Sequence, residues 1–215
     1  MERMKDGAES RRYHHGALRE ALLEAAEAEL IEKGEDGFSL RSTAKRAGVS
    51  HAAPAHHFRD LAALLHALAA RGFDRLTAVM KAEQAAAGAD AAGTDDAAGQ
   101  VVAAGIGYVR FAIDNPALFQ LMFGGRGGGD KPAELAKAAE AGFSVLVNGV
   151  ARVGGRDALT TEAGWRDVMA VWAIMHGYAH LAIGGKVAWL SDQPFEAQRA
   201  VIADQVRRAL RLAEG

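Results

Sequence analysis

Apolar side chains recur every three or four residues along most of this 215-residue chain, which is the spacing that one buried face of an α-helix requires. The first such stripe contains Leu18, Leu22, Ala26 and Leu30, with glutamates on the opposite side. Alternating runs of β-branched residues, which are typical of strands, are almost absent. The pattern predicts an all-α fold of about nine helices.

Helix-capping and helix-breaking residues divide this pattern into segments. Gly34 is a stop for the first helix, and Gly48 ends the second. Ser39, Ser50 and Asp60 are N-caps for the second, third and fourth helices. After the first helix, the expected helices cover residues 40–47, 51–57, 60–81, 101–113, 116–123, 133–153, 161–190 and 194–212.

Composition narrows the class of protein. The chain has no cysteine, which excludes disulfide scaffolds, zinc–cysteine modules and thiol catalysis. No uninterrupted apolar run approaches the roughly 20 residues needed to cross a bilayer. Residues 1–12 are polar and lack the apolar stretch of a secretory signal. We therefore expect a cytoplasmic protein with no membrane partner.

Charge is distributed unevenly, although the net charge is only −2. Residues 10–19 carry three arginines and no acid, and residues 38–59 carry four bases and no acid. Residues 20–36, between them, carry seven acids and one lysine. A local basic face on an acidic body suits a duplex-binding module, because phosphate charges act over only about 10 Å in salt.

The segment from Ser39 to Arg59 has the pattern of a helix-turn-helix, in which a glycine-containing turn joins two short helices. Leu40, Ala44 and Ala47 share one face that would pack inward, and Val49 would plug the turn. The alternative is an ordinary helical corner with a solvated basic face. The caps, the turn glycine and the lack of acids agree with one another and favour the helix-turn-helix.

A DNA-binding role follows for the outer residues of this segment. Lys45, Arg46 and Arg59 would clamp the phosphate backbone, and Ser50 with its free backbone amides would grip a phosphate. The candidate DNA-binding residues are Arg41, Lys45, Arg46, Ser50, His51, Ala52, Ala53, Ala55, His56, His57 and Arg59.

The stretch from Tyr13 to Leu76 resembles the N-terminal domain of TetR-family transcriptional regulators. The resemblance is carried by Tyr13-His14-His15-Gly16, Phe38-Ser39-Leu40-Arg41, Ala47-Gly48-Val49-Ser50 and His57-Phe58-Arg59-Asp60. Further along, Trp172, His176 and Gly177 are similar to the signature of the Trp-His-Gly subclass of C-terminal domains in that family.

The resemblance implies a domain order and a mode of action. Residues 1–15 would form a basic arm, 16–80 the DNA-binding domain with its helix-turn-helix at about 39–59, and 81–215 a ligand-binding and dimerisation domain. A homodimer would read a palindromic double-stranded operator. A small molecule in the C-terminal domain would release the DNA.

Three positions depart from the family pattern. Ala55 stands where an aromatic residue commonly contacts the DNA backbone, and Leu61 stands where a lysine would contact a phosphate. Ser42 replaces a frequent glutamate, so we expect no full capping box on the Ser39 helix.

The C-terminal half offers apolar side chains for a ligand pocket, although each one could equally be ordinary core. The candidate pocket residues are Tyr108, Phe111, Phe119, Met122, Phe123, Phe143, Trp172, Met175 and His176. The last two helices carry more apolar surface than one small domain readily covers, which predicts a homodimer built through them rather than internal packing alone. That surface comprises Leu181, Val187, Trp189, Leu190, Phe195, Val201, Ile202, Val206, Leu210 and Leu212.

Catalysis finds no support in the sequence, and no cofactor or metal is expected. The glycine-rich stretch 124–129 has neither the Lys-Ser/Thr ending nor the preceding strand of a P-loop. His176 and His180 are four residues apart, as in some metal sites, but no acid or cysteine accompanies them. The expected function is a ligand-released repressor. The alternatives are a helical metal protein or enzyme that uses this histidine pair, and a DNA-binding activator without a ligand.

Overall fold

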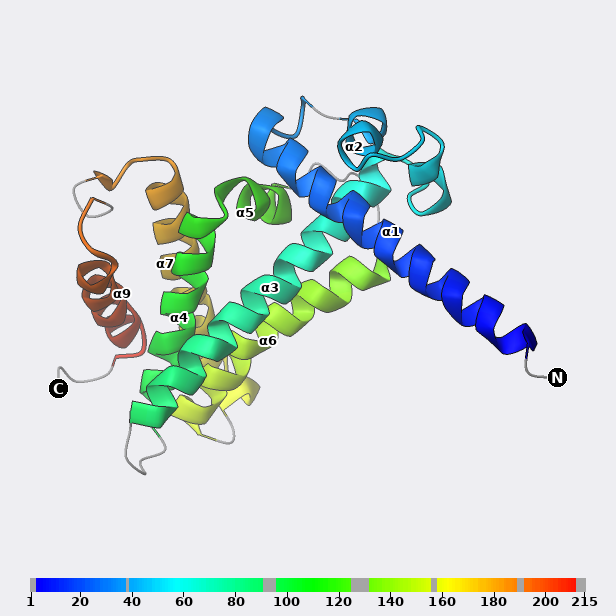
Figure 1. Cartoon of the computed structure of the whole chain (residues 1–215). Helices are drawn as coiled ribbons and strands as arrows, with labels where there is room; N and C mark the ends of the chain where they lie inside the picture. Colours follow the sequence, from blue (N-terminus) through cyan, green and yellow to red (C-terminus); the bar gives the residue numbers. More distant parts are fainter. Residues whose placement is uncertain are drawn as a thin grey trace.

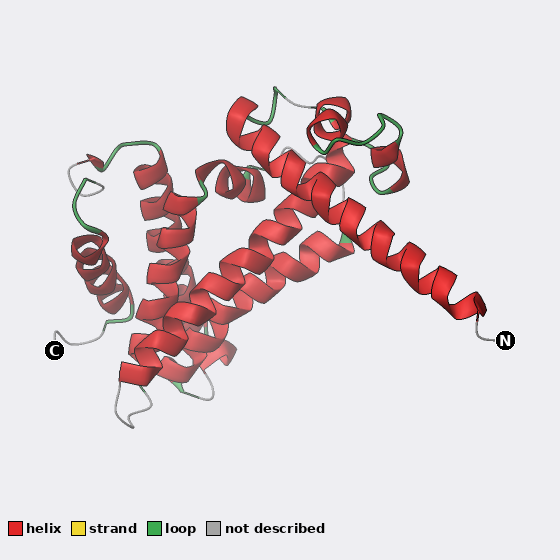
Figure 2. Cartoon of the chain, in the orientation of Figure 1, coloured by secondary structure: helices red, strands yellow, loops and turns green. Residues whose placement is uncertain are grey.

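The computed structural model describes residues 3–37, 39–90, 96–124, 132–155, 158–188 and 192–211, and every regular element in these ranges is helical (Figure 2). The α-helices are α1 (Arg3–Lys33), α2 (Leu40–Arg46), α3 (Leu61–Asp90), α4 (Ala97–Asp114), α5 (Pro116–Phe123), α6 (Ala133–Gly154), α7 (Glu162–Ile183) and α9 (Phe195–Ala209). Two 3₁₀ helices, η1 (Ala53–His56) and η2 (Ala158–Thr160), accompany them. The all-α prediction is confirmed, with eight α-helices in the described ranges.

Two groups of helices share α3 (Figure 1). At one end, α1, α2 and η1 gather around the beginning of α3, which α1 crosses. Along the rest of α3 lie α4 and α6, with α7 packed against both of them and α9 against α4 and α7. Helix α5 contacts α1, α3 and α4, so it joins the two groups.

One apolar cluster runs through both groups. It includes Leu22 of α1, Leu68 of α3, Phe111 of α4 and Ile202 of α9, each of which is almost completely buried. The division near residue 80 expected from the sequence falls inside α3, which runs without a break from Leu61 to Asp90. The assignment of separate domains on either side of it stays a prediction.

The predicted helix ends are confirmed at several positions. Gly34 and Gly48 both adopt the left-handed backbone conformation, with φ of 70° and 69°, which a glycine reaches without the steric cost of a Cβ. The Asp60 side chain accepts a hydrogen bond of 2.8 Å from the backbone N–H of Ala63 and so caps α3. Pro116 begins α5. Proline suits this position because the N–H that it lacks would have no partner in the first turn of a helix.

Other helix boundaries differ from the expectation. Helix α1 begins at Arg3, so residues 3–15 of the expected arm are helical in their backbone. Helix α3 continues to Asp90 rather than ending near Lys81, because the alanines that follow Gln84 are strong helix formers. Helix α7 ends at Ile183 instead of reaching residue 190. Gly185 stops it by turning the backbone to a φ of 65°.

The expectation of an incomplete cap on α2 is wrong. The Ser39 hydroxyl accepts a hydrogen bond from the Ser42 N–H at 3.2 Å, and the Ser42 hydroxyl accepts one from the Ser39 N–H at 2.9 Å. A serine side chain is long enough to close this reciprocal pair, so glutamate is not required. Phe38 and the side chains of Tyr13–Gly16 lie outside the described part of the chain.

No helix in the described ranges is both long enough and apolar enough to cross a bilayer.

Candidate DNA-reading surface and ligand cavity

The helix-turn-helix is held together by small apolar contacts. Ala44 is fully buried, and Leu40, Ala47 and Val49 pack against the common core. Phe58 is 3% exposed and closes this core from the far side of the turn. The inward face predicted from the sequence is therefore confirmed.

A buried glutamate fixes α2 against α1. Glu29 is 2% exposed and accepts hydrogen bonds of 2.6 Å from Lys33 and from Arg46, while Arg46 also pairs with Glu32. The hydrogen bonds from Lys33 and Arg46 lower the pKa of Glu29 to about 2 against the opposing effect of burial. Arg46 is exposed, but these two glutamates already engage its guanidinium. Its role as a phosphate clamp stays a prediction.

The second element of the motif differs from the predicted helix over 51–57. It is a single 3₁₀ turn, η1, with Pro54 buried beneath it and Ala52 as its N-cap residue without a side-chain hydrogen bond. The prediction that Ser50 caps this element with its side chain is wrong. Its backbone carbonyl accepts a 3.0 Å bond from Ala53 instead, because Pro54 has no N–H to extend an α-helical ladder. Such a short turn has no helix N-terminus with which to grip a phosphate.

The surface over this turn is exposed and basic. Of the candidate DNA-binding residues, Arg41, Lys45, Arg46, Ser50, His51, Ala52, Ala55, His56 and Arg59 are exposed, whereas Ala53 and His57 are half-buried. Arg59 is 87% exposed and pairs with Asp60 at 2.9 Å. This exposed set, hereafter the reading surface, combines small side chains, imidazoles and bases, which suits contacts to groove edges and phosphates.

Asp60 ties the reading surface to α3. Its carboxylate accepts the Ala63 N–H and pairs with Arg59, and these two contacts, the backbone bond first, lower the pKa of Asp60. His66 of α3, nearly two turns after Asp60, already lines the cavity described next. The helix that Asp60 caps beside the reading surface therefore also forms part of the cavity wall.

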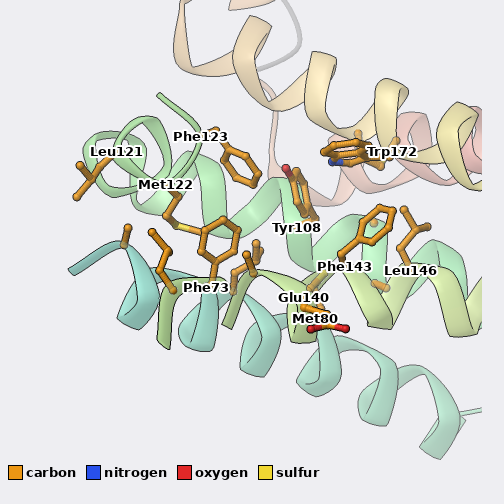
Figure 3. A pocket seen from close by; sticks show the side chains of 18 of the residues that line it. Phe73, Met80, Tyr108, Leu121, Met122, Phe123, Glu140, Phe143, Leu146 and Trp172 are labelled. Atoms are coloured by element: carbon orange, nitrogen blue, oxygen red, sulfur yellow. The ribbon is translucent and has the colours of Figure 1, made fainter. Parts of the chain in front are cut away.

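A cavity of about 650 Å³ lies between α3, α4, α5, α6 and α7 (Figure 3). Six of the nine predicted pocket residues line it, namely Tyr108, Met122, Phe123, Phe143, Trp172 and Met175. Phe111 and Phe119 are instead buried in the core beside it. His176 lies behind Tyr108, whose hydroxyl is 2.8 Å from the His176 Nδ1.

Sequence reasoning missed the contribution of α3 to this cavity. Leu65, Ala69, Phe73, Leu76 and Met80 all line it. Their spacing of three and four residues was visible in the sequence. Assigning everything before residue 80 to the DNA-binding part removed them from consideration as pocket residues.

Burial shifts the pKa of Tyr108 at the cavity wall and of His176 behind it. It raises the pKa of the Tyr108 hydroxyl, against a smaller opposing effect of the Trp172 indole. It also lowers the pKa of His176, helped by the neighbouring His180. Both groups are therefore uncharged at neutral pH.

The histidine pair does not form the core of a metal cluster in this part of the chain. The His176 and His180 rings meet edge to face, with centroids 4.5 Å apart. Among the described residues, no three His, Asp or Glu side chains come together in a way that could hold an ion. One nitrogen of His176 already faces the Tyr108 hydroxyl.

The apolar residues predicted for a dimer separate into two sets. Ile202, Val206 and Leu210 are buried inside the subunit, and Phe195 and Val201 are half-buried. For the first three, internal packing against α4 and α7 explains the apolar pattern. Leu181 is 47% exposed, and Val187 is half-buried. Trp189, Leu190 and Leu212 lie outside the described residues.

Further exposed apolar residues lie on α7, the helix that also carries Leu181. Trp165 and Met169 are 44% and 49% exposed, and they share the outer side of this helix with Ala173 and Gly177. A Cβ added at Gly177 would meet nothing within 4 Å. We call Trp165, Met169, Ala173, Gly177 and Leu181 the outer face of α7.

The fold and the exposed reading surface define a helical DNA-binding regulator. Residues 22–68 match the model of the tetR family of bacterial regulatory proteins, and residues 101–205 match that of a tetracyclin repressor-like C-terminal domain. The chain belongs to the TetR family, and it is a DNA-binding transcriptional regulator of this non-enzymatic family.

Solved structures share this fold. A protein of unknown function from Rhodococcus sp. RHA1 is 35% identical, with a TM-score of 0.74 over 94% of this chain and 98% of its own. A TetR family transcription regulator from Marinobacter aquaeolei VT8 is 18% identical, with a TM-score of 0.66 over 92% and 97%. PfmR, a TetR family transcriptional regulator from Thermus thermophilus, is 19% identical, with a TM-score of 0.58 over 91% and 96%. No curated protein matches the chain significantly.

Proposed function

We propose that this regulator is a homodimeric repressor, and that a small molecule bound in the cavity releases it from a palindromic operator. The observation that carries the proposal is the continuity of α3. One helix begins at the Asp60 cap beside the reading surface and then supplies Leu65, Phe73 and Met80 to the cavity wall. A ligand that repositions the wall therefore repositions the reading surface.

Helix α5 supplies a second connection between the cavity and the reading end. Met122 lines the cavity and also lies against Gly72 of α3, where an added Cβ would stand only 2.6 Å from the Met122 sulfur. Arg75 of α3 binds both Glu27 of α1 and Asn115, which precedes α5. Movement of α5 on ligand binding would reach α1 and α3 through these contacts.

The thermodynamic requirement is simple. A ligand shifts the protein between two states only by its difference in affinity for them. The ligand must therefore bind the DNA-free arrangement of α3 more tightly than the DNA-bound one.

We further propose that the outer face of α7 forms the homodimer, together with the adjoining part of α9. Trp165 and Met169 supply apolar area, and Gly177 allows a second helix to approach closely. A two-fold axis here would place two reading surfaces in successive major grooves, about 34 Å apart. Trp172 in the cavity wall, His176 behind it and the open Gly177 also support a place in the Trp-His-Gly subclass.

Selection of bound duplexes from a random DNA pool tests the reading function. The purified protein is used at about 0.15 M salt, where nonspecific binding is weak. We expect enrichment of an inverted repeat whose half-sites are about one helical turn apart. Failure to enrich any sequence, or enrichment of a single half-site only, contradicts a dimeric operator reader.

Met169→Glu tests the dimer, because it replaces an exposed apolar side chain of the outer face of α7 by a charge. We expect a monomer in sedimentation analysis and operator binding at least about tenfold weaker, since each half-site is then bound separately. Ala78→Glu introduces the same charge at an exposed position of α3 and should remain dimeric. An M169E protein that stays dimeric would show that the subunits meet elsewhere.

A further inference from the structure

We infer that the cavity takes an apolar aromatic cation rather than an organic anion. This inference rests on the proposed function, because it concerns the ligand of the same site. It follows from three properties of the cavity, namely the charges on its wall, its aromatic rings and the state of its polar groups.

The charges on the wall disfavour an anion. Among the described residues that line the cavity there is no lysine and no arginine, the one imidazole is that of His66 of α3, and the one acid is Glu140 of α6. Glu140 is exposed and forms no ion pair with any residue that the structure describes. A carboxylate or phosphate entering here would lose its hydration and find no lysine or arginine among these residues, only the imidazole of His66. The loss of hydration is costly in an apolar site.

The rings favour a cation with aromatic or polycyclic surface. Phe73 and Phe123 meet edge to face at 5.3 Å, and Phe143 and Trp172 do so at 5.4 Å. These four side chains project into the same space in Figure 3, together with Tyr108. Ring faces carry partial negative charge and attract cations most strongly where water is excluded.

The polar groups of the wall leave little for a ligand rich in hydrogen-bonding atoms. The Tyr108 hydroxyl is already engaged by His176 at 2.8 Å, and it interacts with Trp172 as well. A volume of about 650 Å³ lies within the range of sites that enclose drug-sized molecules. The ligand chemistry is thus a mostly apolar body with one positive charge directed toward Glu140.

Two ions of the same shape and opposite charge test the inference directly. Tetraphenylphosphonium and tetraphenylborate are titrated into the full-length protein by calorimetry, with triphenylphosphine oxide as an uncharged probe. We expect the phosphonium to bind at least about tenfold more tightly than the borate. Equal or tighter binding of the borate, or no binding of the phosphonium, overturns the inference.

Substitution of Glu140 locates the charge preference. Glu140→Gln should weaken phosphonium binding about threefold to tenfold and leave the uncharged probe unaffected. Glu140→Lys should bring borate binding up to or above that of the phosphonium. Asp74→Asn removes an exposed carboxylate of α3 that does not line the cavity, so it should leave all three affinities unchanged. Equal effects of E140Q and D74N would contradict a local role for Glu140.

A parallel measurement separates this inference from the proposed function. The selected operator is titrated with protein in the presence and absence of saturating phosphonium. If the phosphonium binds with the expected preference but leaves operator affinity unchanged, the ligand class holds and ligand-driven release fails. If the borate binds preferentially and releases the operator, release holds and the ligand class fails.

Discussion

Helix α3 joins two regions that are stabilised in different ways. At the reading end, short elements are fixed by caps and ion pairs, such as the Ser39–Ser42 box and the contacts of Glu29. In the body, long helices are fixed by apolar packing around Phe111 and Val109, and that packing leaves a cavity. The stability of the reading end therefore depends on individual polar contacts, whereas that of the body depends on how closely its helices approach one another.

The largest effect is expected where the reading surface meets DNA. The double variant Arg41→Ala, Lys45→Ala removes two exposed bases of α2. We expect operator affinity to fall about a hundredfold and the slope of log affinity against log salt to become shallower by about two. Fluorescence anisotropy at several salt concentrations measures both quantities.

Lys81→Ala is the control, because it removes an exposed base of α3 that lies 20 residues, or about 30 Å, along the helix from Leu61. Its operator affinity should be close to wild type. An unchanged salt slope in the double variant would mean that α2 does not face the phosphates.

The next largest effect, on the free energy of unfolding, is expected where α3 and α4 approach each other closely. At Gly107 of α4, an added Cβ would stand 2.9 Å from the Met80 Cα and 3.1 Å from the Val79 carbonyl oxygen, both of them backbone atoms. Gly107→Ala should therefore lower the free energy of unfolding by about 2–3 kcal/mol, as measured by urea denaturation.

Gly88→Ala is the matched helical glycine, since its Cβ would meet only a side-chain atom at 3.5 Å. It should raise stability by about 0.5–1 kcal/mol. Similar results for the two variants would show that α3 and α4 can separate without cost.

Loss of the buried carboxylate should destabilise the reading end by a smaller amount. Glu29→Gln should cost about 1–2 kcal/mol at neutral pH, because Lys33 and Arg46 each lose an anionic partner but remain partly solvated. The folded-state pKa of Glu29 is lowered from 4.5 to about 2. Its stabilising contribution is therefore complete above its unfolded value and is lost as the pH falls from there toward the folded one.

The gap in unfolding free energy between E29Q and wild type should consequently close as the pH falls through that window. Chemical denaturation at a series of pH values measures it. A gap that stays constant down to the lower end would assign the effect to packing rather than to charge.

The smallest effect concerns His176 behind the cavity. Burial lowers its pKa below the ordinary value, so the unfolded chain binds this proton more readily than the folded one does. The contribution of neutral His176 to the free energy of unfolding should be fully present above about pH 6.5. It should decrease as the pH falls below that value, by at most about 1.4 kcal/mol per pH unit. His176→Gln removes this titration and should flatten the profile in that interval. Parallel profiles for the two proteins would mean that His176 accepts a proton in place.

The features predictable from the sequence are those that neighbouring residues decide. Gly34, Gly48 and Asp60 act through the backbone within a few residues, and each ends or begins a helix as expected. The short length of η1 is also decided by a residue within it, because Pro54 has no N–H to donate to a helical hydrogen bond. The same proline accounts for the role of Ser50, which accepts a backbone hydrogen bond from Ala53 and does not cap η1.

The features that the sequence does not predict depend on contacts between distant segments. Nothing in the sequence indicates that Arg46 pairs with Glu29, which lies 17 residues earlier. Periodicity puts Phe119 on an apolar face but does not say whether that face meets the core or the cavity. The same limit applies to Ile202, whose apolar stripe suited a dimer but packs inside the subunit.

The unbroken course of α3 has a mechanical consequence. Thirty residues of α-helix form a rod about 45 Å long, and Phe73 in the cavity wall lies about 18 Å from its beginning at Leu61. A tilt of about 5° around Phe73 would sweep Leu61 through about 1.6 Å. In a symmetric pair the two displacements add, so the separation between the reading surfaces would change by about 3 Å against a groove repeat of about 34 Å. In the repressor proposed above, the rod would act as a lever that converts a small swelling of the cavity into a mismatch with the DNA.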